Sequence, residues 1–335
     1  MPATAAKIVQ ISTEPSWGTS TAPATATIKV HGITDATLKI VSVVEPISQV
    51  GWFGPGPVAQ EQAHSGEATW DLVMTYEESP RILNGFFTAI GASTTTTAPY
   101  NYPYTAPITS TQVVRTYGIE YGTSGLPYKA LGSVAKHFNI TGEAGGFWNG
   151  RVDWIAKQIV VTSQLTTGLD DRTVRPVRVA DTRLYISAFS TGTIGATGDI
   201  VSDTLISFDF DMETNRHLKQ FAGAITPADW GDGKFEGTLK FIAEFNSNAK
   251  ALVDELLGST GAAVSRQIRL EASQGTSSEY KEFNIDFAGI KTEGELLYGD
   301  RDGNMTVEFT FMGRYSTGLG NWLAMNVQNG SSSTT

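Results

Sequence analysis

Two stretches of the chain alternate hydrophobic and polar residues as a half-buried strand does. In residues 67–76 the apolar positions are Trp70, Leu72, Met74 and Tyr76. In residues 236–245 the matching positions are Leu239, Phe241, Ala243 and Phe245. A period of two over this length predicts a strand with one face in a core.

Each of these strands is followed by the pattern of an amphipathic helix. After the first, Ser79 and Pro80 are typical of a helix start, and apolar residues share one stripe, namely Ile82, Leu83, Phe86, Phe87 and Ile90. After the second, Asn246 or Ser247 is the expected cap and Gly258 the expected stop, with Leu252, Val253, Leu256 and Leu257 between them.

The likeness between the two halves continues on both sides of these elements. Residues 37–44 resemble 204–211, and residues 137–140 resemble 282–285. Asn149-Gly150 and Asp302-Gly303 stand before alternating runs and predict hairpin turns. The chain is therefore expected to contain one domain twice.

This duplication sets the predicted boundaries. They are an N-terminal arm 1–25, a first domain 26–165 with an insertion 92–116, a linker 166–180, a second domain 181–325 and a flexible tail 326–335. The insertion is polar, with four consecutive threonines and a proline, and this favours a surface loop. The alternative is an arm that contacts a neighbouring subunit through its tyrosines.

Composition narrows the range of functions. The 335 residues carry a formal charge of −10, which disfavours a protein that grips nucleic acid and is compatible with a surface that DNA slides past. The absence of cysteine excludes disulfides and thiolate metal sites. No apolar run approaches the length of a membrane span. The many glycines and few charged residues favour short strands and turns.

The candidate chemistry is weak. None of the four histidines has zinc-site spacing, and His137 is expected to face solvent from a strand. Asp300, Asp302 and Asn304 resemble part of a calcium loop, but position twelve is Phe311, so a hairpin turn is favoured over a cation site. Asp209 and Asp211 could be paired carboxylates, although a solvated strand face is favoured. We therefore expect neither an enzyme nor a cofactor.

The N-terminal segment 12–19, Ser-Thr-Glu-Pro-Ser-Trp-Gly-Thr, followed by Ala22-Pro23, resembles the opening of major tail (tail tube) proteins of long-tailed, non-contractile bacteriophages of the siphovirus type. The strand from Gly237, the helix 247–257 and the hairpin near Asp302 extend the resemblance. It implies a mainly β fold with two tandem β-sandwich or partial-barrel domains, each flanked by one α-helix.

The resemblance also implies a function and partners. Family members stack as rings around a DNA channel, usually six domains to a ring, so two domains per chain imply three copies with pseudo-six-fold symmetry. Implied partners are the tape measure protein and the tail terminator and tip proteins. The implied location is the virion tail, assembled in the host bacterial cytoplasm, with no membrane and no sequence-specific contact to the viral DNA that passes through.

Two sets of residues are candidates for this role. Polar strand residues that could face the channel are Asp71, Thr75, Asp209, Asp211 and Glu244. Candidates for contacts between rings are Trp17, Gly18, Tyr100, Tyr102 and Tyr104.

Three other functions remain open from the sequence. They are a carbohydrate-binding or adhesin β-sandwich on a surface, a glycan-cleaving enzyme with two carboxylates, and a tube protein of a contractile or secretion system.

Overall fold

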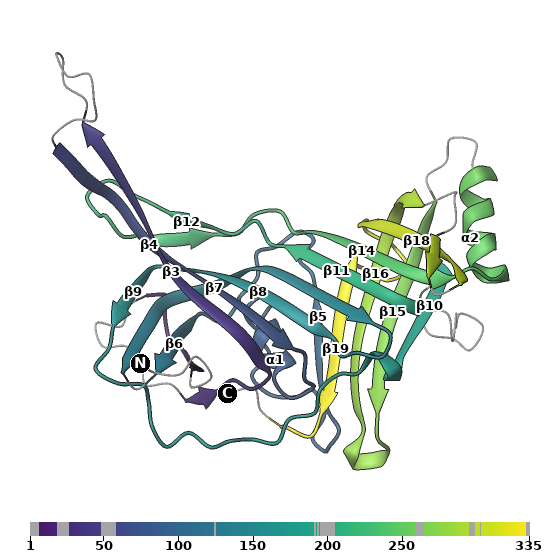
Figure 1. The fold of residues 1–335 in the computed structure, drawn as a ribbon, viewed down its shortest axis with the longest axis horizontal. Helices are drawn as coiled ribbons and strands as arrows, with labels where there is room; N and C mark the ends of the chain where they lie inside the picture. The colour runs from purple at the N-terminus through teal and green to yellow at the C-terminus, as the bar shows by residue number, and fades with distance from the viewer. Residues whose placement is uncertain are drawn as a thin grey trace.

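The chain folds mainly as antiparallel β-structure, which confirms the predicted fold class (Figure 1). The computed structural model describes residues 7–18, 27–47, 58–123, 125–190, 192, 194, 205–258, 264–294, 299–301 and 303–332. The elements of the first half are β1 (Ile8–Thr13), β2 (Ile28–Lys29), β3 (Ile33–Ile47), β4 (Val58–Val73), α1 (Ser79–Leu83), β5 (Tyr100–Thr105), β6 (Tyr117–Thr123), β7 (Leu126–Glu143), β8 (Asn149–Ala156) and β9 (Gln158–Val161).

The second half continues with a similar set of elements. They are the 3-10 turn η2 (Val179–Asp181), β10 (Thr182–Ala188), β11 (Leu205–Glu213), β12 (His217–Lys219), β13 (Asp229–Gly231), β14 (Glu236–Glu244), α2 (Ser247–Gly258), β15 (Ser265–Gln274), η4 (Ser277–Glu279), β16 (Lys281–Gly294), β17 (Gly299–Arg301), β18 (Asn304–Gly313) and β19 (Leu323–Asn329).

The strands of the two halves pair in the same order. In the first half β3 pairs with β4, β4 with β8 and β8 with β7. In the second half β11 pairs with β14, β14 with β18 and β18 with β16. The order β1–β6–β7 in the first half also matches the order β10–β15–β16 in the second. In addition, β9 pairs with β7 in the first half, and β19 pairs with β16 in the second.

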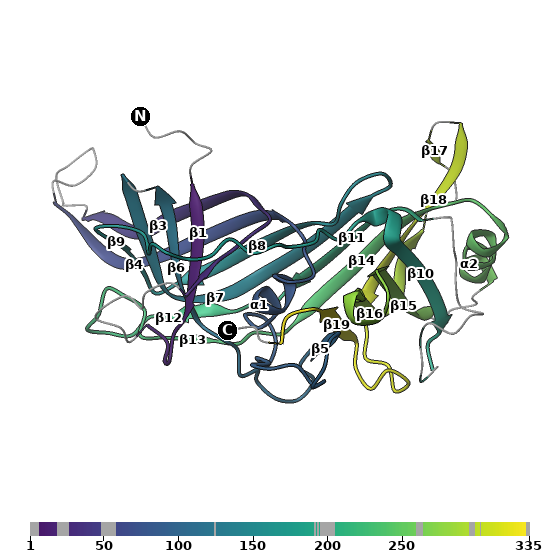
Figure 2. The ribbon, with the colours of Figure 1, turned by 90° about the horizontal axis from the view of Figure 1, so that it is seen from below.

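Two pairings join strands of the two halves, β5 with β19 and β7 with β11. The second part of β7 is antiparallel to β11, so that Ser207–Glu213 runs beside residues 137–143 (Figure 2). We call the resulting layer β3–β4–β8–β7–β11–β14–β18–β16 the shared sheet, and the β7–β11 pairing its seam. In Figure 1 strands β15, β16 and β19 cross β7, β11 and β14 steeply.

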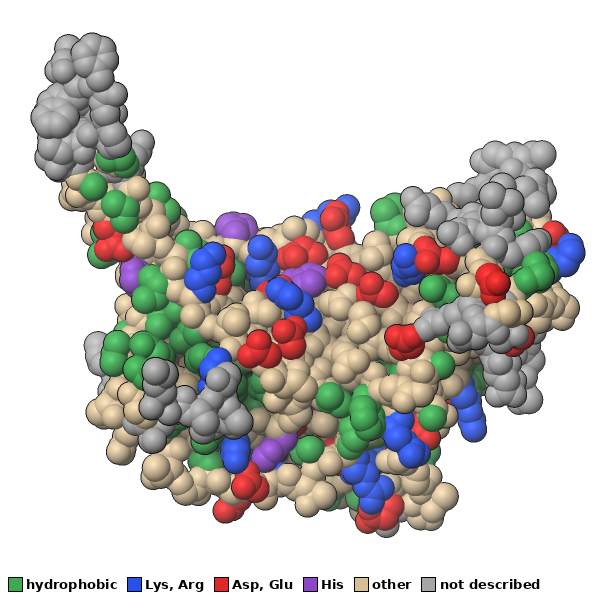
Figure 3. All heavy atoms as spheres, in the orientation of Figure 1, with side chains coloured by type: hydrophobic (Ala, Val, Ile, Leu, Met, Phe, Trp, Pro, Cys, Tyr) green, Lys and Arg blue, Asp and Glu red, His purple; other side chains and the backbone are tan. Residues whose placement is uncertain are grey.

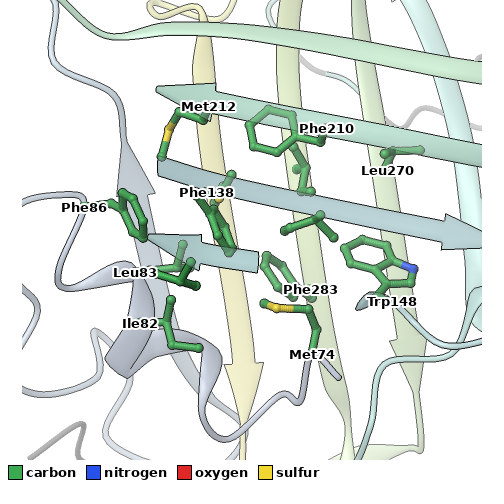
Figure 4. Close-up of a cluster of buried hydrophobic side chains, with 14 of the residues drawn as sticks. Met74, Ile82, Leu83, Phe86, Phe138, Trp148, Phe210, Met212, Leu270 and Phe283 are labelled. Carbon is green, nitrogen blue, oxygen red and sulfur yellow. The ribbon is translucent and has the colours of Figure 1, made fainter. Parts of the chain in front are cut away.

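A single hydrophobic core serves both halves. The buried residues form one cluster that includes Phe138 of β7, Phe210 of β11 and Phe283 of β16 (Figure 4). Trp148 of the first half packs its ring 4.9 Å from that of Phe208 and 5.3 Å from that of Phe283 in the second. Apolar burial therefore ties the halves to each other as well as stabilising each one.

The register shows which residues correspond. The pairing of β3 with β4 skips Thr34, and the corresponding pairing of β11 with β14 skips Ile206. In the same way, the pairing of β7 with β8 skips Lys136, and the corresponding pairing of β16 with β18 skips Thr292. These matching irregularities set the alignment of the halves. Trp70 then corresponds to Phe241, two residues from the predicted match, and His137 corresponds to Glu293. The predicted match of residues 137–140 with 282–285 is wrong, because residues 282–285 pair with β15 and β19 in another part of the fold.

Both predicted helices form, at different lengths. Helix α1 has Glu78 at its N-cap without a side-chain cap, and it ends at Leu83, although the apolar stripe through Phe87 is buried. Helix α2 is capped as predicted, because Oδ1 of Asn246 accepts a hydrogen bond of 3.0 Å from the Ala249 amide.

Only one of the two predicted turns is correct. Gly303, at φ +83°, lies between β17 and β18. Asn149 and Gly150 instead pair with Thr141 and Ile140 inside the sheet. A Cβ on Gly150 would lie 2.6 Å from Sδ of Met74, so this glycine serves close packing and not a turn.

The insertion 92–116 and the tail also differ from their predictions. Strand β5 of the insertion pairs with β19 of the second half, and residues 326–329 of the expected tail are part of β19. Tyr102 and Tyr104 are 0% and 2% exposed and donate hydrogen bonds to the carbonyls of Ser331 and Pro80. These two tyrosines therefore join parts of one chain and offer no surface to a neighbour.

Candidate functional site: the outer face of the shared sheet

The shared sheet has one apolar and one polar face. Trp70, Val152, Phe138, Phe210 and Leu239 alternate into the core. The side chains between them lie on the other side of the sheet, where Ile242 and Met312 stand among polar residues. We call the polar residues of this side the outer face, which includes Thr37, Lys39, Glu67, Thr69, Asp71, His137, Asn139, Thr141, Arg151, Asp153, Asp209, Asp211, Glu213, Thr238, Lys240, Glu244, Thr306, Glu308 and Thr310. Carboxylates outnumber cations in this set, and charged side chains gather in a band across the molecule (Figure 3).

The densest contacts of this face lie at the seam. Nδ1 of His137 lies 3.0 Å from Oδ2 of Asp153 on β8, and its Nε2 lies 2.7 Å from Oδ2 of Asp211 on β11. Both ring nitrogens face acceptors, so both carry a proton and the ring is an imidazolium. The cation therefore bridges one carboxylate from each half.

The same geometry moves the pKa values of these groups. Hydrogen bonds to Asp153 and Asp211 raise the pKa of His137 to about 10. Burial acts to raise the pKa of Asp153, but hydrogen bonds from His137 and Thr69 outweigh it and the pKa is lowered. The bridge is thus charged at neutral pH.

Neighbouring side chains continue the network along the strands. Nδ2 of Asn139 donates to Oδ1 of Asp209 across the seam at 2.6 Å. The hydroxyl of Thr69 donates to Asp153 at 2.6 Å, and Lys240 pairs with Glu308 at 2.8 Å. The outer face is therefore held by its own hydrogen bonds.

Four of the five predicted channel residues lie on this face. Asp209 and Glu244 are exposed, and Asp71 and Asp211 are half-buried. Thr75 is the exception: it is 3% exposed and forms a bridge with Pro176 beyond the end of β4, so its assignment to a solvent face is wrong. The alternation that placed it ends with β4 at Val73.

The N-terminal candidates are half-buried against their own chain. Nε1 of Trp17 donates to the Gly132 carbonyl at 2.6 Å, and Nζ of Lys157 lies 5.3 Å from its ring centroid. The amide of Gly18, at φ +57°, donates to Oε2 of Glu14 at 3.1 Å. Tyr100 on β5 is also half-buried.

The segment around Asp300, for which the sequence favours a hairpin turn over a cation site, forms a turn where it is described. Oδ1 of Asp300 accepts the amide hydrogen of Gly303 at 2.9 Å. Asp302 and the side chain of Asn304 lie outside the described residues. In the described part of the chain no group of three or more metal-ligating side chains is arranged around a common point, and no helix there is long and apolar enough to cross a membrane.

The sequence model of the phage tail tube protein family matches residues 4–313. The chain belongs to this family. A search of curated proteins finds no match. The family places the chain among the structural proteins of the phage tail. Trp70 and Trp154 are 2% and 1% exposed, so these two side chains are not available to bind a glycan.

One structural residue of this tail tube protein was missed by the sequence reasoning. Arg216, which follows β11, has a side chain with 0% exposure. Its guanidinium donates to the carbonyls of Gly85, Phe86 and Ala135 in the first half and to Asp232 in the second. Burial lowers the pKa of Arg216, although the hydrogen bond that it donates to the Asp232 carboxylate acts to raise it. A lone arginine has no sequence signal for such a role, because three of the four partners named here are backbone carbonyls.

Proposed function

We propose that this chain assembles into rings that stack as a phage tail tube, and that the outer face of the shared sheet lines its channel. The observation that carries the proposal is that both halves contribute to one unbroken sheet with an apolar face and a carboxylate-rich face. Membership of the tail tube family supports the assembly. A closed ring would also cover sheet edges that would otherwise aggregate.

An acidic wall suits the passage of DNA. Asp71 and Glu244 lie on the outer face, and no described cation is paired with either. Carboxylates repel the phosphates of DNA, and hydroxyl groups only hydrate these phosphates. Contact with such a wall therefore releases no counterions from the DNA, and the wall does not hold the DNA strand. DNA would then move through without sequence-specific contact.

The repeated order of strand pairing supports a duplicated tube domain, although the repeated strands include β1 and all of β19 and so extend beyond the predicted bounds of 26–165 and 181–325. Each half supplies four strands to the shared sheet, and the β7–β11 seam places them side by side. Three chains would then supply the six domains of a ring.

The remaining partners follow from this assembly. We propose that the tube surrounds a tape measure protein and ends on terminator and tip proteins of a non-contractile tail built in the bacterial cytoplasm. Trp17, Gly18 and Tyr100 keep part of their surface accessible and remain the candidates for contacts between rings.

Negative-stain electron microscopy together with the mass in solution tests the assembly. We expect tubes or rings with a central hole of DNA width, built from three chains per ring. A particle that stays monomeric at every concentration refutes the tube, and a ring of six whole chains refutes the duplication argument.

The channel is tested by reversing charge on the outer face. Phage particles carrying Asp209→Lys with Glu244→Lys should assemble and release their DNA more slowly, because lysines hold phosphates. The matched control is Asp229→Lys with Glu279→Lys, two exposed carboxylates outside the outer face. Equal release by both variants would show that the outer face does not line the channel.

A further inference from the structure

The second half contains a counterpart of the projecting β3–β4 hairpin. The matching irregularities align Val41 of β3 with Glu213 of β11. In the first half β3 continues past Val41 to Ile47 and stays paired with β4, so the hairpin extends the sheet (Figure 1). In the second half β11 ends at Glu213, and the chain between it and β14 forms the separate hairpin β12–β13. The same connection is therefore an extension of the sheet in one half and a detached hairpin in the other.

Contacts at its base turn the second hairpin away from the sheet. The amide and the hydroxyl of Thr214 both donate to the Lys136 carbonyl at the bulge of β7, at 2.9 and 2.8 Å. Asn215 follows with φ +52°, a left-handed conformation that redirects the strand. The buried guanidinium of Arg216 then anchors the turn to three carbonyls of the first half, and its hydrogen bond to Asp232 joins the two sides of the hairpin base. The direction in which the hairpin leaves the sheet is therefore fixed by its own base.

The detached hairpin ends against the projecting one. The amide of His64 on β4 donates to the carbonyl of Ile225, between β12 and β13, at 2.7 Å. The pairing of β4 with β8 begins only at Gly66, so in the part of the chain that the structure describes no strand pairs with residues 58–65 on that side. Pro227, two residues from this contact, is buried. The detached hairpin therefore covers a strand edge that would otherwise be open to pairing.

We infer that the β12–β13 hairpin is a brace, which supports the projecting β3–β4 hairpin from within the same chain and is not a second projecting arm. Beyond Gly66 the described part of the projection has only two strands, and a two-stranded ribbon is marginally stable in water. The brace itself is held at its base, because the ring of Trp230 on β13 lies 5.4 Å from Cζ of Arg216. One consequence rests on the proposed function: a ring would carry one projecting hairpin per chain, not one per domain.

Hydrogen exchange of the unassembled chain measures the brace directly. A shortened variant replaces residues 220–227 by Asn-Gly, a two-residue turn that closes Lys219 onto Ala228, whose amide already donates to the Lys219 carbonyl at 3.0 Å. The base of the hairpin is untouched, so this variant should fold with Arg216 in place. We expect the amide of His64 to exchange at least about tenfold faster than in the wild type. The amides of residues 70–73, which lie on the same strand and pair with β8, should exchange as before.

A matched control keeps the backbone of the brace. Phe221→Ala with Ile225→Ala changes two exposed side chains and leaves the carbonyl that accepts from His64, so the exchange of the His64 amide should stay as in the wild type. Unchanged exchange at His64 in the shortened variant would refute the brace.

A covalent lock tests whether the brace stays in place during assembly. The chain has no cysteine, so His64→Cys with Ile225→Cys supplies two thiols that a short bismaleimide joins within one chain. We expect the locked protein to form rings in the same yield as the unreacted double variant. Loss of ring formation on locking alone would show that the hairpin must leave this position, which overturns the inference. If the wild-type protein forms no rings, the proposed function fails, and the exchange of His64 still decides the brace.

Discussion

Nε2 of His137 lies 2.7 Å from Oδ2 of Asp211, and this contact joins the two halves of the chain across the seam of their shared sheet. The other ring nitrogen is held by Asp153, so the histidine is a cation between two carboxylates. A residue on a solvent face has in this way become part of the junction between the two halves of the chain.

His137 makes stability depend on pH in the alkaline range. Its folded pKa, about 10, lies above the ordinary value of 6.5. The contribution of His137 to the free energy of unfolding is therefore full below about pH 6.5. This contribution declines as the pH rises and is lost above about pH 10. We expect His137→Gln to lower the melting temperature at pH 6 and to have little effect at pH 10.5. Thermal unfolding followed by circular dichroism across this range measures both.

A double-mutant cycle checks the assignment of that effect. Asp211→Asn should destabilise the wild type more than it destabilises His137→Gln, because the two substitutions remove the same contact. Strictly additive losses would show that the two side chains do not interact in solution.

Arg216 should be among the most sensitive positions outside the apolar core. Arg216→Met leaves three carbonyls and the Asp232 carboxylate without their donor, and we expect a loss of about 3–5 kcal/mol in the free energy of unfolding. Arg175→Met is the control, since that side chain is 44% exposed with its Glu279 partner at 3.6 Å. Urea denaturation should distinguish the two variants. Equal, small losses in the free energy of unfolding for both variants would contradict the role given to Arg216.

Tyr104 contributes through its hydroxyl as well as its ring. Tyr104→Phe removes the 2.9 Å hydrogen bond to the buried Pro80 carbonyl, and we expect it to cost about 1–2 kcal/mol. Tyr100→Phe, on the same strand and half-buried, should cost less than about 0.5 kcal/mol. If the two variants unfold at the same urea concentration, β5 is held by its backbone pairing alone.

Lys291 should show the opposite pH dependence from His137. Burial lowers its pKa to about 8, from 10.5, while Nζ lies 4.2 Å from the ring centroid of Phe309. The folded state therefore carries a penalty that is full below about pH 8 and vanishes above about pH 10.5. We expect Lys291→Met to stabilise the protein by about 1–3 kcal/mol at pH 7. A gain that persists unchanged at pH 10.5 would point to packing and not to the charge.

The sequence by itself determined the local structure of much of the chain. The alternation around Trp70 and Phe241 predicted β4 and β14, and the patterns after them predicted both helices, because period and caps are local properties. The order of elements predicted two similar halves, and the N-terminal segment pointed to the tail tube family. The same alternation placed Asp209, Asp211 and Glu244 on a polar strand face.

Only the tertiary structure decided how these pieces meet. Register depends on which strands pair, so the short match between His137 and Glu282 was misleading, and matching bulges were needed to align the halves. The sequence pattern placed Tyr102 and Tyr104 in a surface loop, because the residues that they contact are distant in sequence. The pairing of β7 with β11, the bridge through His137 and the burial of Arg216 all rest on contacts between the halves. Such contacts leave no periodic trace in either strand, since each partner alone is a polar residue on a solvated face.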